Sequence, residues 1–305
     1  MSGAGSSSPT PPPTAASWRF DAIGTSWEIV TRAPLDAGTR TAVTAAIERF
    51  DAAWSRFRAD SVVTALARGG GSMPAPVDAD AMLDAFVELS AATGGAVNPL
   101  IGASLERLGY DASYTFSARG PVPAPPDWTA SLSWRGGVLA LDVPEVIDVG
   151  ALGKGRLVDI VAGIVAGSAG ADLVVDAGGD IAVRGAPQRI GLEHPFDPRR
   201  AIGVWEVTDA ALCASAVNRR AWGDGLHHVL DARTGAPVRA FAATWAVAST
   251  AMRADAVATA LFFDGGPRLA SEWGVEWVRM TTDGRVEWSP GCRADLFTGQ
   301  ASVER

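Results

Sequence analysis

The sequence is poor in cysteine and histidine, the residues from which disulfide frameworks and zinc sites are built. Its 305 residues include two cysteines, Cys213 and Cys292, and three histidines. The cysteines lack a metal-binding spacing, so a disulfide framework and a cysteine-rich zinc site are excluded, although a single disulfide bridge stays open. Because the histidines show no ligand spacing either, we do not expect zinc.

Long apolar runs and a recognisable targeting segment are also lacking. The longest apolar run is well short of the roughly 18 residues that a transmembrane helix needs. The N-terminal stretch MSGAGSSSPTPPPTAAS has no basic start and no apolar core, so it resembles neither a signal peptide nor a lipoprotein leader. We therefore expect a disordered Ser- and Pro-rich tail over 1–17, a single folded domain over 18–305, and a cytoplasmic protein.

The sequence also has fewer basic than acidic residues. The chain has 26 Lys and Arg against 34 Asp and Glu, a formal net charge of −8. Its overall field repels nucleic acid and anionic membrane surfaces. Since that field also opposes any anionic ligand, such a ligand must be held by local donors or by a metal ion.

Hydrophobic periodicity predicts several helices. One buried helical face is indicated by apolar residues spaced four and three apart: Val43, Ile47, Phe50, Trp54 and Phe57. A second helix is predicted over 78–92, with Leu83, Phe86 and Val87 pointing inward. Further helices are predicted over 156–166, 252–263 and 267–273.

Strand patterns lie between these helices. Strands are predicted over 26–32, 173–176, 181–184, 189–193, 203–207, 210–214, 226–230 and 243–248. Turns at 135–137 and at Asp283-Gly284 indicate hairpins, and the Pro-rich segment 117–128 is typical of a surface connection. Because helices and strands mix without strict alternation, we expect an α+β fold, a single domain with mixed or antiparallel sheets and flanking helices.

The stretch DVGALGKGRLVD, residues 148–159, looks like a phosphate-binding loop but fails the test for one. A P-loop would need glycine at Asp148 and Ser or Thr at Gly155, and the dinucleotide pattern G-x-G-x-x-G is absent as well. Its three glycines still allow a close approach of backbone to a ligand, and the helix behind them would point N–H groups at it. A turn that only packs a helix against a strand is an equally good interpretation of the stretch alone.

A second polar constellation lies in MRADAVATALF, residues 252–262. Asp255 and Thr259 stand four residues apart, so they share one face of the predicted helix. A carboxylate and a hydroxyl one turn apart are hard oxygen ligands suited to Mg²⁺ or Ca²⁺. Without further context, a helix cap or a core hydrogen bond explains the pair better.

Taken together and in order, these motifs resemble the ApbE family, the Mg²⁺-dependent FAD:protein FMN transferases. The resemblance covers most of the chain from Gly24 to Gly265. It is carried by IGTSW (23–27), SRFRADS (55–61), TGGAVNPLIG (93–102), DVGALGKGRLVD (148–159), VVDAGGDIAVRG (174–185), HHVLDARTGAP (227–237) and ADAVATALF (254–262).

The resemblance implies a T-fold-like domain that holds FAD in a deep cleft and transfers FMN to a Ser or Thr hydroxyl of an acceptor flavoprotein, releasing AMP. It implies Mg²⁺ ligation by Asp255, Thr259 and the backbone carbonyl of Ala151. His228 would be the base, since its ordinary pKa near 6.5 suits that role, and Asp255 is the second catalytic residue. The residues implied to bind FAD are Gly24, Thr25, Asn98, Lys154, Gly178, Gly179, Asp180 and His228.

The chain departs from the family pattern at several positions, namely Val62, Ala67, Val97, Ala216 and Val217. These changes are expected to alter flavin geometry or acceptor choice, because the metal and pyrophosphate motifs are intact. Two alternatives stay open: an FAD pyrophosphatase that releases FMN and AMP, and a non-catalytic FAD-binding protein. The sequence does not identify the acceptor protein.

Overall fold

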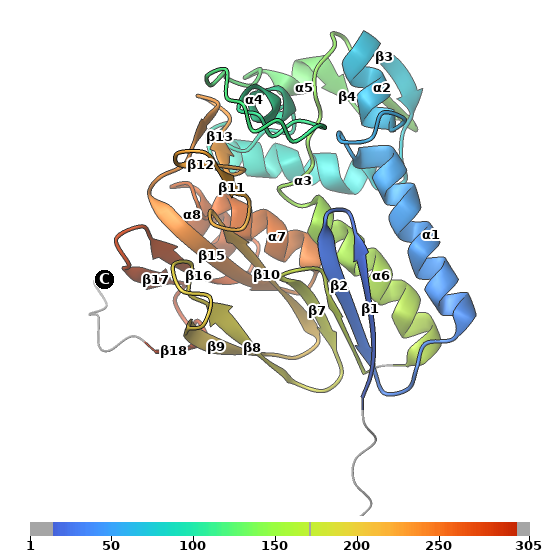
Figure 1. Ribbon diagram of the computed structural model, residues 1–305, viewed down its shortest axis with the longest axis vertical. Coiled ribbons are helices and arrows are strands. Elements are labelled where there is room, and N and C mark those ends of the chain that lie inside the picture. The colour runs from blue at the N-terminus through green and yellow to red at the C-terminus, as the bar shows by residue number, and fades with distance from the viewer. Residues whose placement is uncertain (1–14, 171, 298–305) are drawn as a thin grey trace, which may run out of the picture.

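An antiparallel sheet of eight strands forms the centre of the computed structural model, which describes residues 15–170 and 172–297 (Figure 1). The strands, in their order across the sheet, are β1 (Ala16–Ala22), β2 (Thr25–Thr31), β6 (Leu173–Asp176), β7 (Asp180–Arg184), β10 (Ala210–Ala216), β15 (Phe241–Ala248), β16 (Glu276–Thr281) and β17 (Val286–Trp288). Every strand pairing within the described residues is antiparallel. The expected α+β domain is thereby confirmed, with antiparallel sheets rather than mixed ones.

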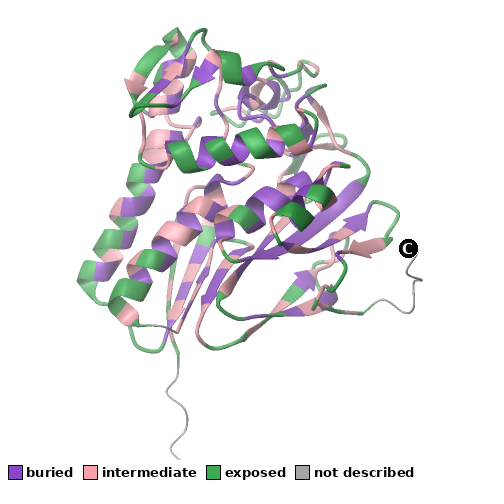
Figure 2. Cartoon of the chain, turned by 180° about the vertical axis from the view of Figure 1, so that it is seen from behind, coloured by how far each residue is buried: buried purple, intermediate pink, exposed green. Residues whose placement is uncertain are grey.

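Helices cover one face of this sheet. They are α1 (Ala37–Trp54), α3 (Ala79–Ala92), α6 (Gly153–Ala169), α7 (Ala251–Ala260) and α8 (Gly266–Glu272). Their apolar faces meet the sheet in one large core. Since β15 is covered on both sides, all eight of its residues are buried, as Figure 2 shows from behind.

A small sheet covers the opposite face. Its strands, in order, are β18 (Asp295–Leu296), β9 (Ala201–Val207) and β8 (Gln188–Glu193). A second apolar cluster around Trp205, Leu212 and Trp245 fills the space between the two sheets. This layer buries the back of the central strands, so their turns and the helix ends can form a site on the other side.

Short elements complete the fold at the end of α1. They are α2 (Val62–Gly69), β3 (Gly71–Pro74), α4 (Gly102–Arg107), α5 (Trp128–Ser131), β4 (Leu132–Ser133), β5 (Val138–Leu141), β11 (Ala221–Trp222), β12 (Leu226–His227), β13 (Leu230–Asp231) and β14 (Ala236–Pro237). The predicted hairpins at 135–137 and 283–284 are confirmed by the β4–β5 and β16–β17 pairings. Within the described residues, no helix combines the length and apolarity needed to cross a membrane.

Several boundaries differ from the prediction. Ala16 and Ser17 already pair in β1, so the tail is shorter than 1–17, and its residues 1–14 lie outside the described residues. The helix predicted from 156 begins at Gly153, and α2 and α4 were missed because they are short. Val87 is 39% exposed and does not point inward.

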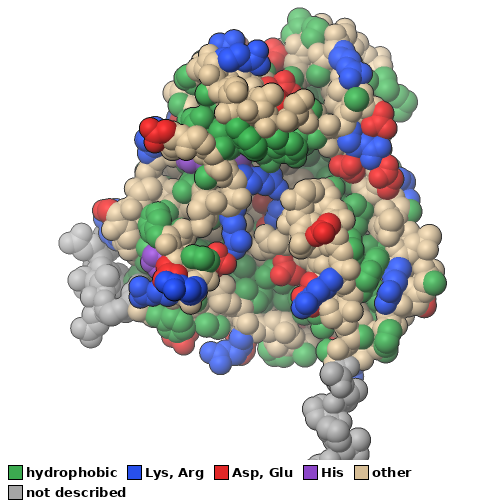
Figure 3. Space-filling view, viewed as in Figure 1, with side chains coloured by type: hydrophobic (Ala, Val, Ile, Leu, Met, Phe, Trp, Pro, Cys, Tyr) green, Lys and Arg blue, Asp and Glu red, His purple; other side chains and the backbone are tan. Residues whose placement is uncertain are grey.

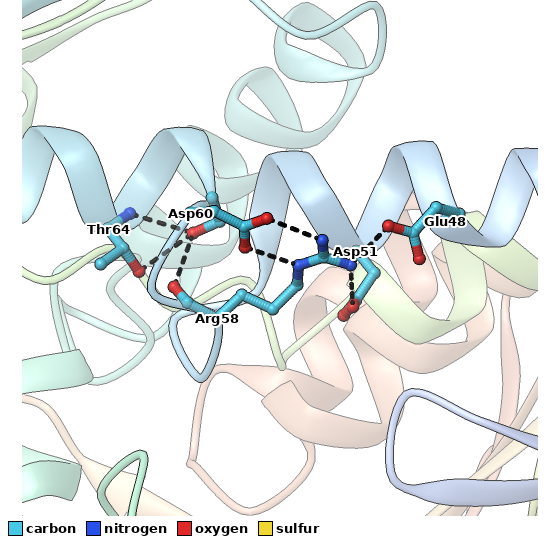
Figure 4. Close-up of polar contacts among 6 residues, drawn as sticks. Glu48, Asp51, Arg58, Asp60 and Thr64 are labelled. Atoms are coloured by element: carbon cyan, nitrogen blue, oxygen red, sulfur yellow. Dashed lines mark hydrogen bonds and ion pairs between the residues drawn. The ribbon is translucent and has the colours of Figure 1, made fainter.

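The corner between α1 and α2 is fixed by an arginine (Figure 4). The Arg58 guanidinium pairs with Glu48 at 2.7 Å, Asp51 at 3.1 Å and Asp60 at 3.0 Å. Ser61 then caps α2 by accepting a hydrogen bond from the backbone N–H of Thr64. Since α1 ends at Trp54, Phe57 belongs to this corner and not to the helical face predicted for it.

Candidate functional site

A cavity of about 1120 Å³ opens where the turns of the central sheet meet the starts of α6 and α7. Its volume suits a large ligand such as a dinucleotide. The predicted site residues that line it are Gly24, Thr25, Asn98, Ala151, Lys154, Gly178, His228, Asp255 and Thr259. The fold therefore gathers motifs from across the sequence at one place.

The lining of the cavity is more basic than the chain as a whole. Five basic and three acidic side chains line it, in a chain of net charge −8. Figure 3 shows Lys and Arg side chains inside the hollow in the middle of this face. Local positive charge of this kind attracts an anionic ligand in spite of the overall field.

The stretch DVGALGKGRLVD, residues 148–159, packs α6 tightly against α7. The Gly155 N–H donates to Asp255 Oδ2 at 2.9 Å. In return, Asp159 accepts hydrogen bonds from the backbone N–H groups of Ala251 at 2.7 Å and Met252 at 2.9 Å. A Cβ on Gly155 would lie 2.7 Å from the Asp255 Cβ and overlap the Ala251 carbonyl. Gly155 and Asp159 therefore join two helices, and neither lines the cavity.

Three oxygen-containing groups that could bind a metal ion line the cavity at this helix contact: the Asp255 carboxylate, the Thr259 hydroxyl and the Ala151 carbonyl. The Thr259 hydroxyl donates to the Ala151 carbonyl at 3.2 Å, and Asp255 lies one turn before Thr259 on α7. No group of three His, Cys, Asp or Glu side chains that could hold a metal forms within the described residues. A carboxylate, a hydroxyl and a carbonyl fit Mg²⁺, which prefers oxygen ligands and completes its shell with water and substrate oxygens.

Charged groups in and beside the cavity wall affect these possible metal ligands. Burial raises the pKa of the Asp255 carboxyl well above its usual range, and the nearby Asp180 carboxylate raises it further. Lys154, the only lysine in the sequence, forms an ion pair with Asp180. Burial lowers the pKa of Lys154, but attraction to Asp180 and Asp255 outweighs it and leaves that pKa above its usual value.

The β6–β7 turn is split between cavity and core. Gly178 lines the cavity and packs so closely on Thr25 that a Cβ would overlap the Thr25 hydroxyl. Gly179 is absent from the lining, and its N–H donates to Asp176 at 3.0 Å. Asp180 is 0% exposed and bound to Lys154. Gly179 and Asp180 thus make contacts within the protein, and their roles in FAD binding stay predictions.

The two neighbouring histidines have different environments. The predicted strand 226–230 is broken into β12 and β13, and His228 lies between them on the cavity wall. His227 is buried and bonded to Val238 and Val229. His228 Nδ1 is buried and has no hydrogen-bond partner within the described residues. Burial and then the charge of Arg220 lower the pKa of His228 to about 3.

Asn98 lines the cavity, but its amide is engaged elsewhere. Its Oδ1 accepts from the backbone N–H of Leu100, and its Nδ2 donates to the Pro125 carbonyl, both at 2.8 Å. The residue thus holds a turn with one of its two amide N–H groups and one of the two lone pairs of Oδ1. Of the departures from the family pattern, Val97 and Ala216 line the cavity, while Val62, Ala67 and Val217 do not.

An aromatic wall was missed by sequence reasoning. It consists of Phe57, Tyr110, Tyr114, Phe116 and Trp222, which all line the cavity. Phe57 stacks on Tyr114 at 5.4 Å and Tyr110 on Trp222 at 5.3 Å between ring centroids. Arg56, which also lines the cavity, packs against this wall: its guanidinium lies 4.2 Å from the Phe57 centroid and donates to Asp148 at 2.6 Å. No sequence pattern links these distant residues.

Comparison with known proteins shows which family the sequence matches. The model of the ApbE family matches residues 23–278. The chain is 28% identical to a protein of Rhodobacter capsulatus named FAD:protein FMN transferase, covering 94% of the chain and 59% of that relative's length. It is 29% identical to a protein of the same name from Treponema pallidum, covering 77% of the chain and 74% of the relative.

Solved structures agree on the fold. The ApbE protein of Thermotoga maritima superposes with a TM-score of 0.79 at 22% identity, covering 90% of this chain and 97% of that one. The flavin transferase ApbE of Vibrio cholerae superposes with a TM-score of 0.75 at 23% identity and the same coverage. At these identities the structures establish a shared fold.

Proposed function

The chain belongs to the ApbE family, and from this membership and the cavity we propose that it transfers the FMN part of FAD to a Ser or Thr hydroxyl of an acceptor flavoprotein. AMP is the second product. The names of the two relatives support this activity. Because the chain spans 59% of the length of one of them, the activity is a proposal for this chain.

One observation carries the proposal. A single cavity holds an all-oxygen donor set, a lysine and a histidine, within a basic lining on an acidic protein. The donor set of Asp255, Thr259 and the Ala151 carbonyl would hold Mg²⁺, which neutralises phosphate charge when bound. Lys154 faces the same region and adds positive charge, while Asp180 fixes its position.

The reaction exchanges one P–O bond for another. The acceptor hydroxyl oxygen bonds to the FMN-side phosphorus, and the bond from that phosphorus to the oxygen of AMP breaks. We assign the hydroxyl proton to His228, whose ring lines the cavity.

The basicity of His228 depends on the bound substrate. Its ordinary pKa was the reason for expecting a base, yet in the free protein burial and Arg220 hold that pKa at about 3. The ring is therefore neutral and able to accept a proton, but it is a weak base. Bound phosphates place negative charge beside the ring and raise its pKa toward the range in which a base works best.

The test is incubation with FAD and Mg²⁺, with and without a candidate acceptor flavoprotein. We expect the acceptor to gain the mass of one FMN with equal release of AMP. Rapid release of FMN and AMP without an acceptor would indicate a pyrophosphatase, and absence of both products would indicate a binding protein.

A variant pair tests the metal ligands. Asp255→Ala should abolish Mg²⁺-dependent turnover. Asp264 is an exposed carboxylate just beyond the same helix, so Asp264→Ala should not. Cell fractionation would test the predicted cytoplasmic location.

A further inference from the structure

One cationic side chain of the cavity is left without a protein partner. Five basic residues line the cavity, and four of them form ion pairs. The four pairs are Arg56–Asp148, Arg58–Asp60, Lys154–Asp180 and Arg219–Glu193. The Arg220 guanidinium makes no hydrogen bond or ion pair within the part of the chain that the structure describes, although it lines the same cavity.

The backbone around Arg220 is anchored on both sides. Asn218 donates to the Pro195 carbonyl at 2.7 Å, and Arg219 pairs with Glu193 at 2.9 Å, so the preceding residues are tied to the end of β8. The His228 N–H donates to the Arg220 carbonyl at 3.3 Å. Arg220 is therefore held beside His228, while the Arg219 side chain, 58% exposed, is engaged with Glu193.

The charge of Arg220 acts on the interior of the cavity. After burial, it is the largest cause of the lowered pKa of His228, and it opposes the rise that burial causes in the pKa values of Tyr110 and Asp255. A guanidinium that is partly withdrawn from water and has no counter-ion loses hydration without compensation. An anion bound at this position would compensate the guanidinium for the lost hydration.

Resting on the proposed function, we propose that Arg220 binds the FMN-side phosphate of the dinucleotide, next to His228. Its planar fork of N–H donors matches two phosphate oxygens, which a lysine cannot do. The FMN-side phosphate is assigned because His228 must lie near the hydroxyl that attacks this phosphorus. The neighbouring Arg219 is already paired with Glu193, so the choice of Arg220 comes from the pairing of side chains.

The test separates the two phosphates with partial ligands. Calorimetric titrations with FAD, FMN and AMP in the presence of Mg²⁺ compare the wild type with Arg220→Ala, Arg220→Lys and Arg189→Ala. Arg189 is the control because it is exposed on β8 and does not line the cavity. We expect Arg220→Ala to weaken FAD and FMN binding by about tenfold to a hundredfold, the loss of a charged hydrogen bond. AMP binding should be unchanged, which also shows that the variant is folded. Arg220→Lys should recover part of the affinity, and Arg189→Ala should retain all of it.

Three results would overturn this assignment. The first is FMN binding by Arg220→Ala as tight as that by Arg189→Ala, the second is a loss of AMP binding instead of FMN binding, and the third is an equal loss of both. A wild-type protein that binds FMN and FAD but transfers no flavin would refute the proposed transfer and leave the phosphate contact standing. A wild-type protein that binds no flavin nucleotide would refute both.

Discussion

Gly155 offers a direct test of how the site is built. It lies in the first turn of α6, where a Cβ would meet the carbonyl group of Ala251 and the Cβ of Asp255 on α7. Neither neighbour is the free end of a side chain. The start of α7 is also held by Asp159 from α6, so the two helices cannot separate without losing those hydrogen bonds. Gly155→Ala therefore forces a strained contact at the centre of the site.

The magnitude follows from two opposing effects. Insertion of a methyl group into a tight contact costs about 1–3 kcal/mol, and the backbone neighbours place this case near 3. Alanine in place of glycine inside a helix stabilises the folded protein by about 1 kcal/mol. The net loss is about 2 kcal/mol for Gly155→Ala. Gly163, in the same helix, has no atom within 4 Å of the added Cβ, so Gly163→Ala should gain about 1 kcal/mol.

Urea denaturation measures both variants. The unfolding free energies should differ by about 3 kcal/mol at an unchanged denaturant slope. The Mg²⁺ dependence of FAD turnover is a second measurement. Because a displaced α7 moves Asp255 and Thr259 away from Ala151, Gly155→Ala should need a higher Mg²⁺ concentration for half-maximal turnover. Gly163→Ala should not. Equal stability of the two variants would refute the close helix contact.

Three further predictions concern buried charge. Asp159→Asn should lower the unfolding free energy by about 1–2 kcal/mol in urea melts, because its amide can accept only one of the two N–H donors at the start of α7; a variant as stable as wild type would contradict this. Asp180→Ala should cost about 3 kcal/mol by leaving Lys154 without its partner, and adding Lys154→Met should recover most of that, as a double-mutant cycle would show or refute. The folded-state pKa of His228, about 3, lies below the ordinary value of 6.5, so the unfolded chain takes up a proton first as the pH falls. From pH 7 to pH 5 the wild type should therefore lose about 2 kcal/mol more stability than His228→Gln; parallel losses would refute the depressed pKa.

Local patterns in the sequence determined most elements and the membership of the site. Helical spacing and strand alternation depend on near neighbours, so α1, α3, α7 and most strands of the central sheet could be predicted. Short elements such as α2 were not predicted, because its eight residues make only about two turns and carry little periodic signal. The metal-ligand prediction rested on Asp255 and Thr259, which share a helix face, and the structure brings Ala151 to them.

The tertiary structure alone decided what each polar residue does. The motif of Asp180 predicts a contact with FAD, and only the structure shows that this buried carboxylate pairs with Lys154. His228 has an ordinary pKa as a residue type and a depressed one in its cavity, because burial and Arg220 penalise the proton. Residue type and spacing fix which groups are present. Hydration and counter-ions decide their chemistry, and both depend on contacts between residues that lie far apart in the chain.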